Sequence, residues 1–335
     1  MTDTISNTNT ASNTNAASNT AEQLTSSLWR LPLPVKTLPP YDHTNSYILL
    51  DVANKLDPAT PAAVTPAAVS GALVVDVGSV EAADALIAWF EEHHCTLQGV
   101  LLTHSHSDHV AGLAHLLEHH FVPVYLHPLE HDRLRQQLPH YRAKEWDVQR
   151  LEDGNTLEHG SLQVSTLHTP GHSRGHLSFV VRQAGQPTVM VAGDMVTGAG
   201  AIWVGTPEGD VSAYLQSLTR LSAVDADCLA PSHGAVSWQP QVLIDNARVH
   251  KQAREQQVLE VLESPASLTD ITNQLYAHVP NNMRDFAERS LQAHLNKLLH
   301  EKRIKALLAP DLVPDLVPDD MHNAQRPVLY QRHKL

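Results

Sequence analysis

The chain has 335 residues, a formal net charge of −13 at pH 7 and two cysteines. This length predicts one large domain followed by a smaller module. Two cysteines exclude a disulfide framework, and the acidic balance weakens nonspecific affinity for nucleic acid. We find no leader sequence and no apolar run long enough to span a bilayer, so we expect a cytoplasmic protein without a membrane partner.

The first 26 residues, 1–26, consist mainly of Asn, Thr, Ser and Ala. Such a segment cannot bury enough apolar surface to offset the entropy lost on ordering, so we expect a disordered tail. A second biased stretch, Leu56–Ser70, is rich in Pro and Ala. We interpret it as an extended hairpin loop between two strands.

Strand and helix patterns alternate between residues 27 and 239, which predicts an α/β domain with two sheets between helices. The predicted strands are Ser46–Leu50, Ala72–Asp76, Val100–Leu102, Val122–Leu126, Leu162–Thr166, Leu177–Val181 and Val189–Ala192. The predicted helices are Val80–His94, Pro128–Gln137 and Val211–Leu221.

One short run in this domain contains three imidazoles and one carboxylate: His104, His106, Asp108 and His109. Imidazole and carboxylate are the ligands that zinc and similar metals prefer. An apolar run precedes the motif and a helical pattern follows it. If the chain leaves a strand here and enters a helix, the first two histidines point together, and Asp108 and His109 point at a second position. The alternative is a solvated histidine-rich loop.

Three further candidate ligands follow apolar runs, each on a turn of small residues that lets the backbone approach a metal closely. They are His172 in T-P-G-H-S, Asp194 in V-A-G-D and His233 in P-S-H-G. Each turn alone is weak support for a metal site. All of these motifs together in one chain are difficult to explain by chance.

The order of these motifs resembles the metallo-β-lactamase fold superfamily over roughly residues Leu28 to Arg254. The resemblance implies a four-layered αββα sandwich with its metals at one edge. It also implies two metal sites and a bridge: His104, His106 and His172 for one metal, Asp108, His109 and His233 for the other, and Asp194 between them. The last motif usually reads G-H-G, and here Ser232 replaces the first glycine.

Two dications about 3.5–4 Å apart lower the pKa of a shared water and produce a hydroxide nucleophile. We therefore expect two divalent metal ions as cofactors; zinc is the default, and manganese or iron also fits these donors. Asp194, as the bridge, and Asp108, as a proton relay in the resembling family, are the predicted catalytic residues. Asp76 and His176 are candidates to hold the outer ring nitrogens of the ligands. The alternative for Asp76 is a turn residue at the end of a strand, and the alternative for His176 is a solvent-facing loop histidine.

From residue 240 to 335 the pattern changes to three helices followed by two short strands. Helices are predicted at Val242–Glu263, from Ser267 and at Asn282–Glu301, and strands at Ile304–Leu308 and Pro327–Gln331, across a repeated Pro-Asp-Leu-Val loop. This order resembles the winged-helix domain of the lactamase-β-like branch, which includes a single-strand endoribonuclease. Carboxylates are interleaved with its cations, so we expect the domain to shape the cleft rather than to bind RNA or DNA.

Three functions remain open. The first is a hydrolase of small esters, thioesters or lactones, and the second is a phosphodiesterase acting on single-stranded RNA. The third is a non-catalytic metal-binding scaffold, which is disfavoured because every ligand position is filled. We do not expect β-lactamase activity, since that subgroup departs from this ligand pattern.

Trp203 either lines the substrate cleft or packs beneath its loop. The sequence leaves the oligomeric state open.

Overall fold

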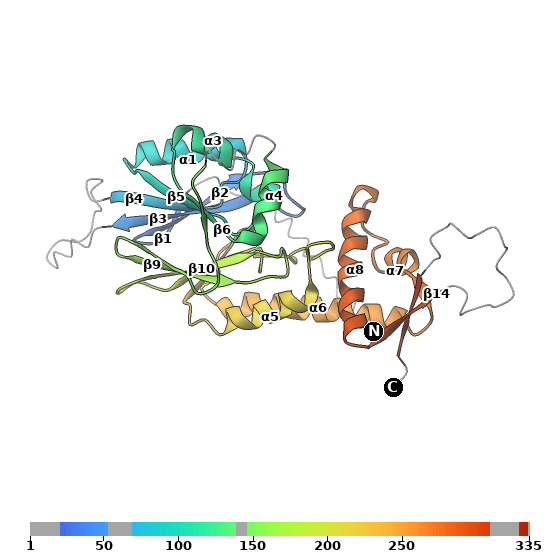
Figure 1. The fold of residues 1–335 in the computed structure, drawn as a ribbon. Coiled ribbons are helices and arrows are strands. Elements are labelled where there is room, and N and C mark those ends of the chain that lie inside the picture. Colours follow the sequence, from blue (N-terminus) through green and yellow to red (C-terminus); the bar gives the residue numbers. More distant parts are fainter. Residues whose placement is uncertain (1–20, 53–68, 139–145, 309–327, 334–335) are drawn as a thin grey trace, which may run out of the picture.

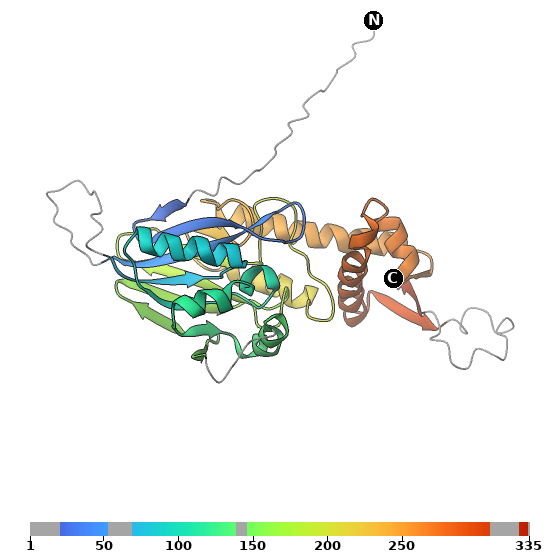
Figure 2. The ribbon, with the colours of Figure 1, turned by 90° about the horizontal axis from the view of Figure 1, so that it is seen from above.

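The computed structural model describes residues 21–52, 69–138, 146–308 and 328–333. Two sheets lie face to face, with helices on both outer sides, and a smaller helical unit lies beside them (Figures 1 and 2). The expected hairpin loop up to residue 68, the Pro-Asp repeat and the tail up to residue 20 lie outside the described residues.

In the described part of the chain, the first sheet has seven strands that follow one another in chain order. They are β1 (Glu22–Thr25), β2 (Leu28–Pro34), β3 (His43–Val52), β4 (Val69–Val75), β5 (Leu97–Leu101), β6 (Val124–Leu126) and β7 (Val148–Arg150). Strands β1 to β4 pair antiparallel, whereas β4 to β7 pair parallel. The carboxyl ends of β4, β5 and β6 therefore meet at one edge, and the histidine-rich loop leaves the sheet there.

The second sheet has five strands within the described ranges, in the order β12-β11-β10-β9-β8. They are β8 (Thr156–His159), β9 (Leu162–His168), β10 (Leu177–Gln183), β11 (Val189–Gly193) and β12 (Cys228–Pro231). Strands β8 to β11 pair antiparallel, and β12 joins β11 in parallel. The three remaining predicted ligands follow β9, β11 and β12.

Helices cover the outer face of each sheet (Figure 1). On the first sheet these are α1 (Val80–Glu92), α3 (Leu113–His119) and α4 (His131–Gln137), and on the second α5 (Val211–Ser222) and the start of α6 (Pro240–Val261). Separate apolar cores fill the three interfaces: Leu86 and Leu116 lie in the first, Tyr47 and Phe179 between the sheets, and Tyr214 in the third. The predicted four-layered αββα sandwich is confirmed.

Helix α1 shows how local sequence determines these elements. The side chain of Ser79 accepts a hydrogen bond from the backbone N–H of Ala82 and so caps the first turn. Ala82, Leu86 and Trp89 repeat at helical spacing and are buried against the first sheet. The helix therefore begins at its polar cap and lies on the sheet through one apolar face.

The N-terminal strands correct one sequence expectation. The disordered tail was expected to reach residue 26, but Glu22–Thr25 form β1, and Leu24 packs against the core between the sheets. Strand β2, which contains Pro32 and Pro34, is absent from the predicted strands. Strand β1 pairs with β2 only up to Arg30, so both prolines lie where β2 is an edge, which is where a sheet tolerates proline.

The C-terminal unit begins along α6 and continues through a winged helix. Its further elements are β13 (Ala266–Ser267), α7 (Leu268–Leu275), α8 (Arg284–His300), β14 (Ile304–Leu308) and β15 (Val328–Arg332). A capping box of Ser267 and Asp270 starts α7. Leu259, Leu291 and Ile304 belong to its separate apolar core.

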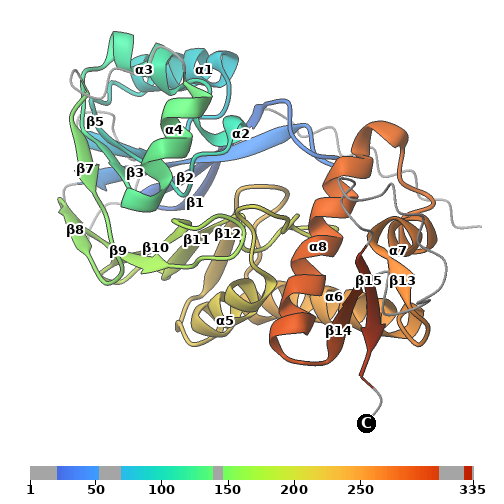
Figure 3. The same cartoon turned by 45° about the vertical axis from the view of Figure 1, so that its right-hand side comes forward.

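The predicted winged-helix domain is confirmed, and α8 lies beside α6 at the end of the sandwich (Figure 3). None of the described helices is long and apolar enough to cross a membrane.

Candidate metal centre

The histidine-rich motif lies at the transition from β5 to the short helix α2 (Ser107–Val110). His104 and His106 lie in the connecting loop, while Asp108 and His109 lie in the first turn of α2. The expected change from strand to helix is therefore present. It directs the two halves of the motif to neighbouring positions.

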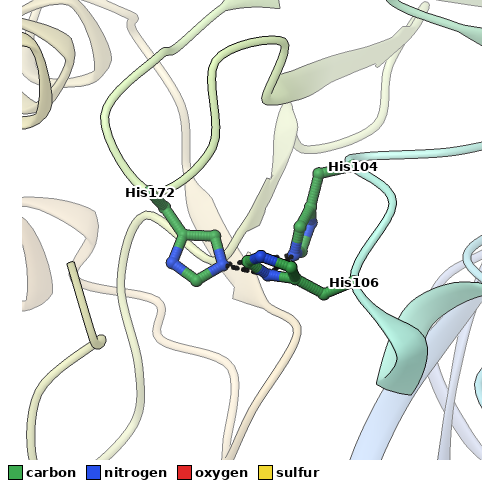
Figure 4. Close-up of side chains that lie close together, drawn as sticks. All are labelled: His104, His106 and His172. Carbon is green, nitrogen blue, oxygen red and sulfur yellow. Dashed lines mark hydrogen bonds between the residues drawn. The ribbon is translucent and has the colours of Figure 1, made fainter. Parts of the chain in front are cut away.

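Three histidines form the first cluster (Figure 4). His104 Nε2 lies 2.9 Å from His106 Nδ1, and His172 Nε2 lies 3.2 Å and 2.8 Å from these two atoms. His172 comes from the turn after β9, so the site joins the two sheets. Three ring nitrogens that converge in this way match the donor set of a divalent metal.

Asp108, His109 and His233 form the second cluster. His233 Nε2 lies 3.6 Å from Asp108 Oδ2, and His109 Nε2 lies 4.0 Å from Asp108 Oδ1. His233 follows β12 of the second sheet, whereas the other two residues belong to α2. Both predicted ligand groups are thus brought together, and their role as ligands remains a prediction.

Asp194 lies between the two clusters. Its Oδ2 is 3.3 Å from His172 Nε2, whereas its Oδ1 is 3.3 Å from His233 Nε2 and 3.6 Å from His109 Nε2. One carboxylate oxygen therefore faces each cluster, which is the geometry that a bridging ligand needs.

Each ligand histidine has one ring nitrogen that faces the centre and one that faces away from it. Most of the nitrogens that face away have a hydrogen-bond partner, and this bond fixes which nitrogen of the ring faces inward. His109 Nδ1 lies 2.7 Å from Asp76 Oδ2, His172 Nδ1 lies 2.8 Å from the Trp203 carbonyl, and His233 Nδ1 lies 3.0 Å from the His43 carbonyl. Asp76 also accepts hydrogen bonds from the backbone and hydroxyl of Thr103. Asp76 thus occupies the expected supporting position.

His176 supports the backbone rather than a ligand ring. Its Nε2 accepts a hydrogen bond of 3.0 Å from the backbone N–H of Asp194, and its Nδ1 lies 2.9 Å from Thr169 Oγ1. A Cβ at Gly193 would lie 2.4 Å from His176 Nε2, and φ at this glycine is +59°. The glycine before Asp194 is therefore required both by its conformation and by the close approach of His176.

Glu130, at the start of α4, is a supporting residue that the sequence analysis missed. It is 2% exposed. One carboxylate oxygen accepts a hydrogen bond from the backbone of Ser105, and the other accepts from the Ser173 hydroxyl and the Gly175 backbone. It therefore links the loop that carries His104 to the turn that carries His172. Nothing in the local sequence marks it, since its partners come from two distant segments.

Burial and neighbouring charges determine the protonation of the centre. Burial lowers the pKa of His172 to about 4, and burial together with His109 lowers the pKa of His104 well below its usual value. Burial also opposes charge on His109, but the carboxylates of Asp76, Asp194 and Asp108 outweigh it and raise the pKa to about 10. His104 and His172 are thus neutral at pH 7 and available to bind a cation, whereas a cation at the second cluster must displace a proton from His109.

Two buried atoms at the centre make no hydrogen bond within the described residues: His109 Nε2 and Asp194 Oδ1. They lie 3.6 Å apart and face the same space. Leaving such polar atoms unpaired is costly, and a divalent cation between them would satisfy both. The nitrogen and oxygen donors present therefore fit a metal of the zinc class.

The ring of Trp203 contacts helix α8. Its Nε1 donates a hydrogen bond of 2.9 Å to the Phe286 carbonyl, and the two rings make an edge contact with centroids 5.6 Å apart. Of the two expected roles, packing beneath the loop is the one that these contacts support.

Comparison with protein families agrees with this geometry. Residues 68–233 match the metallo-beta-lactamase superfamily, and residues 267–307 match the beta-lactamase associated winged helix domain. The two matches correspond to the sandwich and to the C-terminal unit.

Several curated relatives are similar over part of their length. An atrochrysone carboxyl ACP thioesterase from Passalora fulva is 35% identical over 204 residues, which cover 58% of this chain and 54% of that protein. A hydroxyacylglutathione hydrolase from Hahella chejuensis is 33% identical over 157 residues, which cover 47% of this chain and 54% of that protein. A beta-lactamase-like protein 2 homolog from Caenorhabditis elegans is 26% identical over 235 residues, covering 68% and 74%. The chain thus spans about half the length of the first two relatives.

Two solved structures share the fold across nearly the whole chain. A metallo-beta-lactamase family protein from Thermus thermophilus superposes with a TM-score of 0.66 at 23% identity, covering 92% of this chain and 99% of the other. A beta-lactamase domain protein from Burkholderia ambifaria reaches 0.72 at 21% identity, covering 96% and 97%. The two family matches therefore show that the chain combines a metallo-β-lactamase superfamily domain with a β-lactamase-associated winged helix domain.

Proposed function

We propose that this chain is a metal-dependent hydrolase of a small acyl compound, an ester, thioester or lactone, with an acyl thioester as the first choice. The observation that carries the proposal is the carboxylate of Asp194, which faces both donor clusters with separate oxygens. Two relatives above 30% identity are named as an ACP thioesterase and a hydroxyacylglutathione hydrolase. Their names support cleavage of an acyl group.

The centre would hold two divalent ions, and we propose zinc. His104, His106 and His172 would bind one ion, and Asp108, His109 and His233 the other. Bound metals would supply a water of lowered pKa and would polarise the attacked oxygen. Residues of the chain would orient these ligands, because His172 in one cluster and His109 and His233 in the other have hydrogen-bond partners on their outer sides.

Asp108 is placed to handle a proton. Its Oδ2 accepts a hydrogen bond of 2.5 Å from the Thr37 hydroxyl. Burial opposes its charge, but His109 and His233 outweigh burial and lower the pKa of Asp108 below its usual value. The carboxylate is therefore ionised at neutral pH, and it can accept a proton from water and then pass that proton to a leaving group.

A cysteine nucleophile is not available to this centre. Both cysteines are buried in apolar cores, Cys95 beneath α1 and Cys228 between the sheets. Burial raises the pKa of Cys228 to about 12, so its thiolate is not formed at neutral pH. Water is thus the nucleophile in our proposal.

We propose a small-molecule substrate rather than RNA because several cations of the winged helix are already paired. Arg289 lies 2.7 Å from Asp285, Lys297 lies 2.7 Å from Glu255, and Arg303 lies 3.0 Å from Glu255. A phosphate backbone would have to displace these carboxylates to make contacts.

The first test measures metal content and activity on the same sample. Protein prepared without chelator and reconstituted with zinc should bind close to two metals per chain. A panel of acyl thioesters, lactones and phosphodiesters should show turnover on the thioesters first. One metal or fewer after reconstitution with zinc and with manganese would contradict the dinuclear site, and turnover of phosphodiesters alone would contradict the substrate class.

The second test changes the residue between the clusters. Asp194→Ala should lower kcat by at least about 1,000-fold, since the variant loses the group that faces both metal positions. Asp245→Ala, on an exposed part of α6, is the matched control and should keep wild-type turnover. Near-normal kcat in Asp194→Ala with two bound metals would show that the proposed bridge is wrong.

A further inference from the structure

Residues 198–210, part of the loop between β11 and α5, contact the first cluster on one side. The carbonyl of Trp203 lies 2.8 Å from His172 Nδ1. A carbonyl oxygen can only accept, so the Nδ1–H of His172 is the donor in this contact. Further along the loop, Glu208 Oε2 lies 3.5 Å from His106 Nε2. The loop thus contacts two of the three histidines.

The same loop is held from its other side by the C-terminal helices. Lys251 of α6 donates a hydrogen bond of 2.7 Å from Nζ to the Ile202 carbonyl. On α8, the Phe286 carbonyl accepts from the Trp203 indole, and the Arg289 carbonyl accepts from the Thr206 backbone at 3.1 Å. Figure 3 shows α6 and α8 together at this end of the sandwich.

The environment of Lys251 is unusual for a lysine. The residue is 3% exposed, and its Nζ lies 5.3 Å from the centroid of the Tyr214 ring. Within the described residues it forms no ion pair with a carboxylate. Burying an amine costs free energy, which methionine or leucine would avoid at the same position. The hydrogen bond to Ile202 is therefore the interaction that distinguishes lysine from an apolar residue here.

We propose that Lys251 is a positioning residue for the metal centre, which holds the Ile202 carbonyl and thereby the adjacent Trp203 carbonyl that orients His172. The two carbonyls belong to adjacent planar peptide units, and only the φ and ψ angles of Trp203 lie between them, so fixing one carbonyl restricts the other. The C-terminal unit thus completes the support of the first cluster. The inference rests on the proposed function only in treating His172 as a metal ligand.

The test observes the His172 ring directly in metal-free protein labelled with ¹⁵N-histidine, with the resonance assigned from His172→Gln. In the wild type, His172 should be the Nδ1–H tautomer with a slowly exchanging proton. In Lys251→Met this proton should exchange at least about tenfold faster. His233, whose Nδ1 bonds the His43 carbonyl on the opposite side of the centre, is an internal reference and should not change.

A zinc titration of the same variants gives the second readout. Lys251→Met should weaken zinc binding at the first cluster by about tenfold, as expected for loss of an outer support, and leave the second cluster unchanged. Lys305→Met, at an exposed lysine of β14, is the matched control. Lys251→Gln keeps a polar donor on a shorter side chain and serves if the methionine variant does not fold.

An unchanged His172 resonance in a folded Lys251 variant would overturn the proposal. An equal change at His172 and His233 would also overturn it, because that result indicates general loosening. The NMR measurement uses neither metal nor substrate. Failure of the hydrolysis panel would therefore reject the proposed function without affecting this result.

Discussion

At the scale of single residues, the centre depends on side chains that contact ligands or ligand loops from outside. Asp76 fixes the ring of His109, His176 fixes the backbone of Asp194, and Glu130 links two ligand loops. Each is buried and accepts or exchanges several hydrogen bonds, so its loss leaves donors unpaired.

Glu130→Gln tests this support. The amide retains one oxygen acceptor, but its NH₂ group would face donors that the second carboxylate oxygen now satisfies. We expect the free energy of unfolding of metal-free protein to fall by about 2–3 kcal/mol, measured by urea denaturation. Glu118→Gln on the exposed face of α3 is the control. A loss below about 0.5 kcal/mol would show that Glu130 does not hold the loops.

At the scale of elements, α6 connects the two units, and its buried lysine gives stability a distinct dependence on pH. Burial, and then the like charge of Arg254, lower the pKa of Lys251 to about 7. The other groups near it, the Tyr214 ring and the buried His294, do not carry a compensating negative charge: burial lowers the pKa of His294 to about 3, and burial raises that of Tyr214. The folded chain therefore favours the neutral amine.

The sign of the resulting effect follows from proton binding. Between pH 7 and the ordinary lysine pKa of 10.5, Lys251 is protonated in the unfolded chain but neutral in the folded chain. The contribution of Lys251 to stability therefore rises with pH across this window, and it is lost as the pH falls through the window to 7. Wild type should therefore gain about 2 kcal/mol relative to Lys251→Met between pH 7 and 9. Urea denaturation at several pH values measures this difference. Lys305→Met should follow the wild type, and parallel curves for wild type and Lys251→Met would contradict the prediction.

At the scale of the whole molecule, the chain combines a net charge of −13 with a winged helix in which Arg289, Lys297 and Arg303 are paired with carboxylates. A module that served RNA would be expected to present unpaired cations on one face. The acidic molecule instead repels the phosphate backbone at long range. This balance is the physical basis for preferring a small substrate.

Charge reversal in the C-terminal unit tests that preference. The triple variant Arg284→Glu, Arg303→Glu and Lys305→Glu should leave a weak affinity for single-stranded RNA unchanged, as measured by fluorescence anisotropy at several salt concentrations. Thioester turnover should also be unchanged. Tight wild-type binding that weakens with salt, and whose salt slope falls by roughly one unit for each reversed residue, would contradict the proposal.

Much of the fold could be predicted from the sequence because the relevant information is local. The two halves of the histidine motif diverge because a strand ends before His104 and a helix begins at Ser107. Apolar periodicity located most strands and helices of the sandwich, and the order of elements after residue 240 predicted the winged helix. Strand β2 escaped prediction because its prolines are tolerated only at a partly unpaired edge.

The supports of the centre required the folded molecule. Glu130 reaches Ser173 across 43 positions, and Lys251 reaches Ile202 across 49. Neither residue type nor spacing marks such pairs, because their distance depends on the packing of two sheets and on how α6 crosses the second one. The donors of the candidate centre are thus readable along the chain, whereas the groups that hold them in place are determined by packing between distant segments.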